Sequence, residues 1–125
     1  MQLDSLQTYL LTKKGTTEET PFGPDVLVFK VMGKIFALVA WQEAPLRVSL
    51  KCDPELALTL RTQYNAVRPG YHLSKKHWNT VVLDNTIPNH VILGMIDDSY
   101  SLVVKGLKKS VRKMLEHLEQ GGNHK

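Results

Sequence analysis

The chain has 125 residues, with 16 Lys and Arg, 12 Asp and Glu and a formal net charge of +4, which predicts one compact soluble domain. Its single cysteine, Cys52, excludes an intrachain disulfide and favours a reducing compartment. No apolar stretch approaches the roughly 20 residues that span a bilayer, and the N-terminus lacks a secretory pattern. We therefore expect a cytoplasmic monomer without a membrane partner.

The N-terminal part predicts one helix followed by a polar turn. Either Asp4 or Ser5 can cap the helix, which we expect to continue to about Lys14. Pro and Gly residues then make 16–25 a turn region. The expected buried face of the helix comprises Leu3, Leu6 and Leu10.

Three strands are expected next. The apolar runs 26–32 and 34–41, joined at Gly33, predict a β-hairpin. Residues 46–51 alternate apolar and polar side chains, which indicates a strand with one wet face. Because the hairpin is apolar at nearly every position, we expect helices on one side of its sheet and partial cover on the other.

The pair Asp53-Pro54 predicts the start of a second helix. The Asp side chain can cap free backbone N–H groups, and Pro at the first helical position has no N–H to lose. A long loop over 64–77 and a strand over 78–83 should follow this helix. Its expected inner face holds Leu56, Leu60 and either Gln63 or Tyr64.

A third helix should start at Pro88. Its apolar side chains repeat every three or four residues, and Asp97 and Asp98 take its wet side. A short last helix is expected over 111–118.

The order of these elements predicts an α+β fold. We expect a two-layer sandwich in which helices cover one face of an antiparallel sheet. A single domain would occupy 1–119, and 120–125 would be a disordered C-terminal tail.

The segment 67–82 combines positive charge with aromatic side chains. No Asp or Glu occurs between Glu55 and Asp84. Cationic side chains neutralise phosphates and aromatic rings stack on bases, so the pattern favours a nucleic-acid interface, with DNA first. The candidate binding residues are Arg68, Tyr71, His72, Lys75, Lys76, His77 and Trp78.

Two other interpretations of this segment stay open. It can be a solvated loop, with Trp78 packed in the core as the first residue of a strand. It can also dock an acidic protein, in which case the chain is a protein-interaction or regulatory adaptor with aromatic anchors.

Enzyme activity is not expected, because no activated nucleophile or paired carboxylate accompanies the segment. His72 and His77 lack a third metal ligand nearby, so we expect no metal site, and no cofactor motif is present. Cys52 is expected to be a buried, inert thiol.

A second acid-free stretch runs from Ser99 to Leu115. It predicts a secondary basic patch that attracts nucleic acid at long range, with a solubilising helix face as the alternative. The nucleic-acid hypothesis is strengthened if this patch lies on the same side of the fold as 67–82. Together with Arg61, the patch comprises Lys105, Lys108, Lys109, Arg112 and Lys113.

The sequence RPGYHLSKKHWNTV, followed by a predicted helix carrying DDSY, is the most distinctive part of the chain. Through it, residues 48–106 resemble the MmcQ/YjbR family of small bacterial proteins, and a looser similarity of the hairpin extends the match to roughly residues 1–110. The family pattern RPxxHLxKxHW falls on Arg68, Pro69, His72, Leu73, Lys75, His77 and Trp78.

This resemblance implies a frataxin-like (CyaY-like) α+β fold and a double-wing DNA-binding protein of bacterial origin. It does not imply the iron binding of frataxins, which uses an acidic first helix. Here the first helix offers only Asp4 and ends in Lys13 and Lys14. A shared fold does not carry a shared function.

Overall fold

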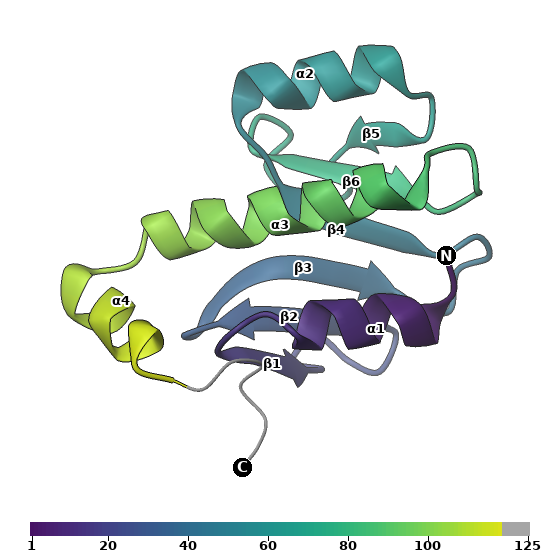
Figure 1. Cartoon of the computed structure of the whole chain (residues 1–125). Coiled ribbons are helices and arrows are strands. Elements are labelled where there is room, and N and C mark those ends of the chain that lie inside the picture. The colour runs from purple at the N-terminus through teal and green to yellow at the C-terminus, as the bar shows by residue number, and fades with distance from the viewer. Residues whose placement is uncertain (119–125) are drawn as a thin grey trace.

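The computed structural model describes residues 1–118, which form four helices and six strands (Figure 1). In chain order these are α1 (Leu3–Leu11), β1 (Thr16–Glu19), β2 (Val26–Val31), β3 (Lys34–Ala40), β4 (Arg47–Lys51), α2 (Pro54–Gln63), β5 (Val67–Pro69), β6 (Trp78–Val82), α3 (Asn89–Lys105) and α4 (Lys109–Glu116). The expected tail 120–125 lies outside the described residues. None of the described helices is both long and apolar enough to cross a membrane.

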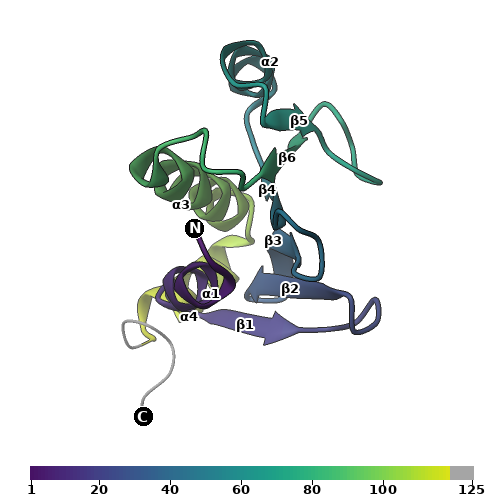
Figure 2. The ribbon, with the colours of Figure 1, turned by 90° about the vertical axis from the view of Figure 1, so that its right-hand side faces the viewer.

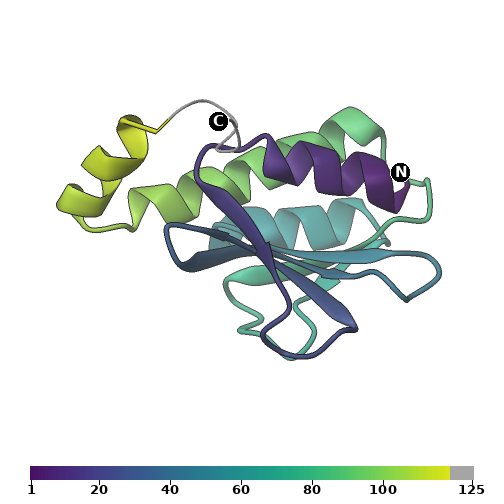
Figure 3. The same ribbon diagram turned by 90° about the horizontal axis from the view of Figure 1, so that it is seen from below.

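The six strands make one antiparallel sheet in the order β1-β2-β3-β4-β6-β5. Seen along the sheet, α1, α3 and α4 lie on one side, and the loops between strands project to the other (Figure 2). Figure 3 shows α1 and α3 side by side over the sheet. The predicted α+β sandwich with helices on one face of an antiparallel sheet is therefore confirmed. We call the other face the open face.

The core lies between the helices and the sheet. Leu6 of α1 and Ile96 of α3 are fully buried against Phe29 and Phe36 of the hairpin. Strand β4 alternates as predicted, with Val48 and Leu50 in this core and Arg47, Ser49 and Lys51 on the open face.

A buried serine joins α3 to two strands. The Ser99 hydroxyl donates to the Phe36 carbonyl at 2.6 Å and accepts the Lys51 N–H at 2.9 Å. The side chain is fully buried, so both bonds are protected from water. They fix α3 at the point where β3 and β4 pass beneath it.

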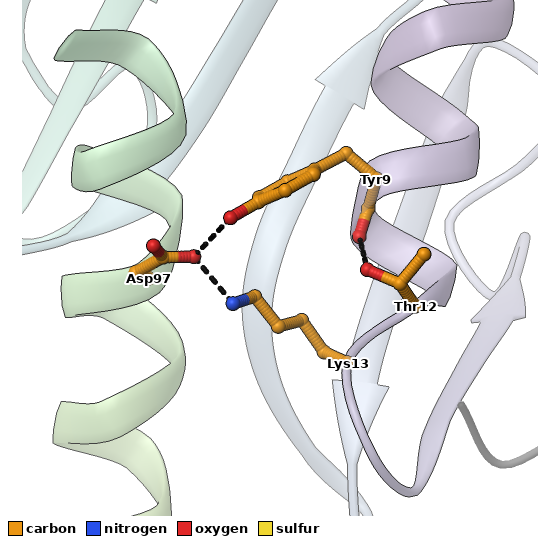
Figure 4. A network of polar contacts seen from close by, with 4 residues as sticks. All are labelled: Tyr9, Thr12, Lys13 and Asp97. Carbon is orange, nitrogen blue, oxygen red and sulfur yellow. Dashed lines mark hydrogen bonds and ion pairs between the residues drawn. The ribbon is translucent and has the colours of Figure 1, made fainter. Parts of the chain in front are cut away.

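A polar network joins α1 to α3 at the surface (Figure 4). The Tyr9 hydroxyl donates to Asp97 Oδ1 at 2.7 Å, and Lys13 forms an ion pair with the same carboxylate. Partial burial of Asp97 opposes its ionisation, but the hydrogen bonds from Lys13 and Tyr9 prevail and lower its pKa. Asp97 and Asp98 were expected on the wet side of this helix: Asp98 is exposed, and Asp97 is 46% exposed but also binds Tyr9 and Lys13 of the N-terminal segment.

Two segments expected to be irregular are edge strands. The first, β1, lies inside the expected turn 16–25 and pairs with β2 from Thr16↔Val31 to Glu19↔Val28. The second, β5, lies inside the expected loop 64–77 and pairs with β6. Neither segment alternates apolar and polar side chains as a typical strand does. At a sheet edge, backbone hydrogen bonds to the neighbouring strand can hold a segment without that pattern.

The predicted starts of α2 and α3 are right, and the predicted start of α1 is wrong. Asp53 accepts the N–H groups of Glu55 and Leu56 at the start of α2, and α3 begins directly after Pro88. Helix α1 instead begins at Leu3, without a side-chain cap. Asp4 and Ser5 are therefore helical residues of the first turn, where a carboxylate still favours the helix dipole.

The inner face of α2 also differs from the prediction. Ala57 is buried, whereas Leu56 is 39% exposed and Leu60 is half-buried. Since α2 covers only the β5–β6 end of the sheet, its buried stripe is narrow (Figure 2). The last helix, α4, starts two residues earlier than the predicted 111–118.

Candidate nucleic-acid interface

The loop between β5 and β6, residues 70–77, carries most of the predicted binding residues, and its backbone is tied to the sheet. The Gly70 N–H donates to the Trp78 carbonyl at 2.9 Å, and the Tyr71 N–H donates to Thr80 Oγ1 at 3.0 Å. At the far end, the His77 carbonyl accepts the Cys52 N–H at 2.8 Å. These bonds fold the loop toward the open face, where Thr80 lies.

Arg61 of α2 holds the same loop from the side. Its Nε donates to Asn79 Oδ1 at 2.7 Å, and its Nη2 donates to the carbonyls of Trp78, at 3.3 Å, and Lys75. The guanidinium therefore makes its hydrogen bonds within the fold. Arg61 was predicted to belong to a basic patch with the C-terminal lysines; the structure makes it a residue that positions the loop.

The tip of the loop presents two rings to solvent. Tyr71 is 66% exposed, and its ring lies 4.0 Å from the His72 ring, at 51°. His72 adopts a left-handed backbone with φ of +58°, which is uncommon for a residue with a side chain. The turn at His72 directs the chain toward Lys75 and Lys76, both exposed.

The strand register places further cations beside the loop. Arg68 of β5 lies opposite Thr80 of β6, and Thr80 lies opposite Ser49 of β4. Directly paired residues share a face of a sheet, so Arg68 belongs to the open face, and Lys51 does as the partner of Trp78. Lys51 was missed in the sequence analysis; its place in the alternating strand 46–51 was the signal that could have found it.

The other predicted residues are divided among different environments. Trp78 is the first residue of β6, but it is half-buried on the open face and outside the main core, so the interpretation that packs it in the core is wrong. Lys75 donates to the Gly70 carbonyl at 3.0 Å and is still exposed, as is His77. Hydrogen bonds from Thr86 lower the pKa of Asp84, and the positive charge of Arg68 adds to that shift.

The secondary basic patch lies elsewhere. Apart from Arg61, its members occupy the end of α3 and the start of α4, on the side of the sheet opposite the loop (Figure 2). The condition that both basic groups share one side is therefore not met. These residues are Lys105, Lys108, Lys109, Arg112 and Lys113.

Cys52 is buried, as expected for a structural thiol. Burial raises its pKa, and the charges of Asp53 and Asp98 raise it further, so little reactive thiolate forms near neutral pH. Within residues 1–118, no group of three or more His, Cys, Asp or Glu side chains is arranged to hold a metal ion.

Comparison with known proteins places this geometry in a family. The family model described as YjbR matches residues 11–102. The chain belongs to the YjbR family. The YjbR protein of Escherichia coli (strain K12) is 38% identical over 118 residues, covering 94% of this chain and all (100%) of that protein. YbdF of Escherichia coli O157:H7 is 41% identical over 93 residues, covering 74% of this chain and 76% of that protein.

Solved structures of similar proteins show the same YjbR architecture. The Deinococcus radiodurans protein DR2400, described as a DUF419 domain, superposes with a TM-score of 0.87 at 39% identity, covering 98% of this chain and 96% of that one. A Pseudomonas syringae protein gives a TM-score of 0.71 at 29% identity, covering 82% and 98%. None of these names states an activity.

Proposed function

We propose that this YjbR-family protein binds nucleic acid, with DNA as the first candidate, through the β5–β6 loop and the adjoining open face. The observation that carries the proposal is a group of cations beside exposed rings on a face that no described helix covers. None of these cations forms an ion pair with a carboxylate of residues 1–118. They are Lys51, Arg68, Lys75 and Lys76.

Each element of this surface has a role in the proposal. The cations neutralise backbone phosphates, which supplies affinity without sequence preference. Tyr71 and His72 offer ring faces on which an unpaired base can stack. Arg61 contributes by keeping the loop in position, since its donors are used by the loop carbonyls.

The proposal predicts a defined salt dependence. If about four phosphates are neutralised, the logarithm of the binding constant should fall with the logarithm of salt concentration at a slope near −3.6 for duplex DNA and about −2.8 for a single strand. Fluorescence anisotropy with short labelled strands and duplexes measures both slopes.

A charge-matched pair of variants locates the site. Arg68→Gln with Lys76→Gln should reduce the magnitude of the salt slope by about two, because two phosphate contacts are lost. The control is Lys105→Gln with Lys109→Gln, which removes the same charge from the opposite side of the sheet and should leave the slope unchanged. Equal effects of both double variants, or binding that does not depend on salt, would contradict the proposal.

A protein partner is the second candidate function, and two exposed aromatic side chains favour it. Tyr71 and Phe22 are each 66% exposed, and both border the same hollow of the open face. Aromatic residues of this kind anchor protein interfaces. A stoichiometric partner that stays bound after nuclease treatment, and is lost in Tyr71→Ala, supports the adaptor; recovery of nucleic acid alone excludes it.

A further inference from the structure

The open face contains a cavity of about 530 Å³. Its floor consists of two rows of paired strand residues. Its walls are Phe22 from the β1–β2 turn and Leu73 with its neighbours from the β5–β6 loop. The floor rows are Val26, Ala40 and Arg47, and Leu38, Ser49 and Thr80.

The size and lining of this cavity suit a small molecule. Ligand sites in proteins usually measure about 300–1,000 Å³ and are mostly apolar with a few placed polar groups. Here Val26, Leu38, Phe22 and Leu73 supply apolar surface from four different segments. The cavity lies on the side of the sheet opposite the main core, so ligand binding does not require the core to open.

Arg47 supplies the specific polar feature. Among residues 1–118, its buried Nε has no hydrogen-bond partner and its guanidinium forms no ion pair. A buried donor without a partner is unfavourable, and an anion that accepts from a guanidinium removes that penalty. Arg47 lies on the cavity floor beside Ala40, within reach of a molecule that fills the cavity.

The acidic groups of the cavity limit the ligand to one negative charge. Asp25 and Glu43 both line the cavity and are exposed, so they belong to its solvent-facing border. A second anionic group near that border would be repelled. We propose that the cavity binds a small, largely apolar molecule with a single carboxylate-type anion, which Arg47 binds. The cavity shares Tyr71 and His72 with the proposed nucleic-acid surface but none of the four cations, and its anion site at Arg47 is separate.

Two fluorescent probes that differ in one charged group test the assignment. Anilinonaphthalene sulfonate has an aromatic body and one anion, and phenylnaphthylamine has the same body without it. The wild-type protein should bind both probes saturably at one site. Arg47→Met should weaken the sulfonate probe about tenfold and leave the neutral probe unchanged, because only the charge-assisted hydrogen bonds are lost.

Two further variants complete the test. Ala40→Trp fills the floor and should abolish binding of both probes. Arg112→Met is the matched control, because Arg112 also has a buried Nε that makes no hydrogen bond within residues 1–118, but it lies in α4, away from the cavity. Thermal unfolding of each variant confirms that it folds. The proposal is overturned if neither probe binds saturably, if Arg47→Met affects both probes equally, or if Ala40→Trp leaves binding intact.

Discussion

Gly70 is the first residue of the β5–β6 loop. At this point the backbone packs directly against Trp78 of the neighbouring strand β6. A Cβ at this position would lie 2.7 Å from the Trp78 Cβ and 3.0 Å from the Trp78 carbonyl oxygen. The same Gly70 N–H donates to that carbonyl at 2.9 Å, so the approach cannot widen without loss of the bond. Glycine is required here for close packing of backbone against a tryptophan.

Gly70→Ala should therefore destabilise the protein by about 1–3 kcal/mol, as other overpacked sites do. Gly94→Ala is the control: Gly94 is inside α3, and beyond its chain neighbours and its own helix backbone no atom of residues 1–118 lies within 4 Å of the added Cβ. Alanine is favoured over glycine in a helix by about 0.5–1 kcal/mol, so this variant should be more stable than wild type. Urea unfolding compares the two, and equal effects would contradict the packing argument.

At the scale of single residues, the sequence predicted which side chains are exposed better than it predicted which groups they contact. It placed Lys76, His77 and Tyr71 correctly on an exposed loop. It could not show that Arg61 contacts loop carbonyls or that Arg47 has a buried Nε, because both depend on segments far apart in the chain. A basic residue on a short helix has the same sequence pattern whether its side chain points into solvent or contacts the rest of the protein.

At the scale of elements, the contact between α1 and α3 should depend on pH. Hydrogen bonds from Lys13 and Tyr9 hold the pKa of Asp97 below its ordinary value, despite the opposing effect of burial. A carboxylate with a lowered pKa stabilises the folded state above its unfolded pKa, and this contribution is lost as the pH falls through the folded pKa.

Asp97→Asn should accordingly reduce the free energy of unfolding at neutral pH by about 1 kcal/mol, a small value because the Asp97 side chain is 46% exposed. The difference from wild type should vanish below the folded pKa of Asp97. Asp98→Asn is the matched control on the exposed side of α3 and should change little. A difference that persists unchanged into acid would contradict this account.

The elements with strong local signals were predicted from the sequence, and the two edge strands were not. The Asp53-Pro54 start of α2, the hairpin and the periodic α3 are confirmed with bounds within a few residues. Strands β1 and β5 are held by backbone pairing with β2 and β6, and the sequence gives no local signal for these pairings. The Ser99 bridge between α3 and the sheet was missed for the same reason.

At the scale of the whole molecule, the sheet separates two basic surfaces. The C-terminal lysines lie with the helices, and the β5–β6 loop lies on the open face with Lys51 and Arg68 (Figure 2). The fold class and the loop were predictable from the sequence, but the separation of the charges was not, because it depends on how the chain crosses the sheet. The proposed interface is therefore smaller and more local than total charge indicates.

In the proposed function, the β5–β6 loop and the adjoining open face bind the nucleic acid. An NMR amide-shift titration with a short mixed-sequence DNA duplex, at low salt and again at higher salt, tests it most directly. If this face binds DNA, the shifts should centre on residues 68–78 and Lys51 and disappear as salt rises, with α4 unaffected. Absence of shifts, or weak shifts spread over every lysine including those of α4, would contradict it.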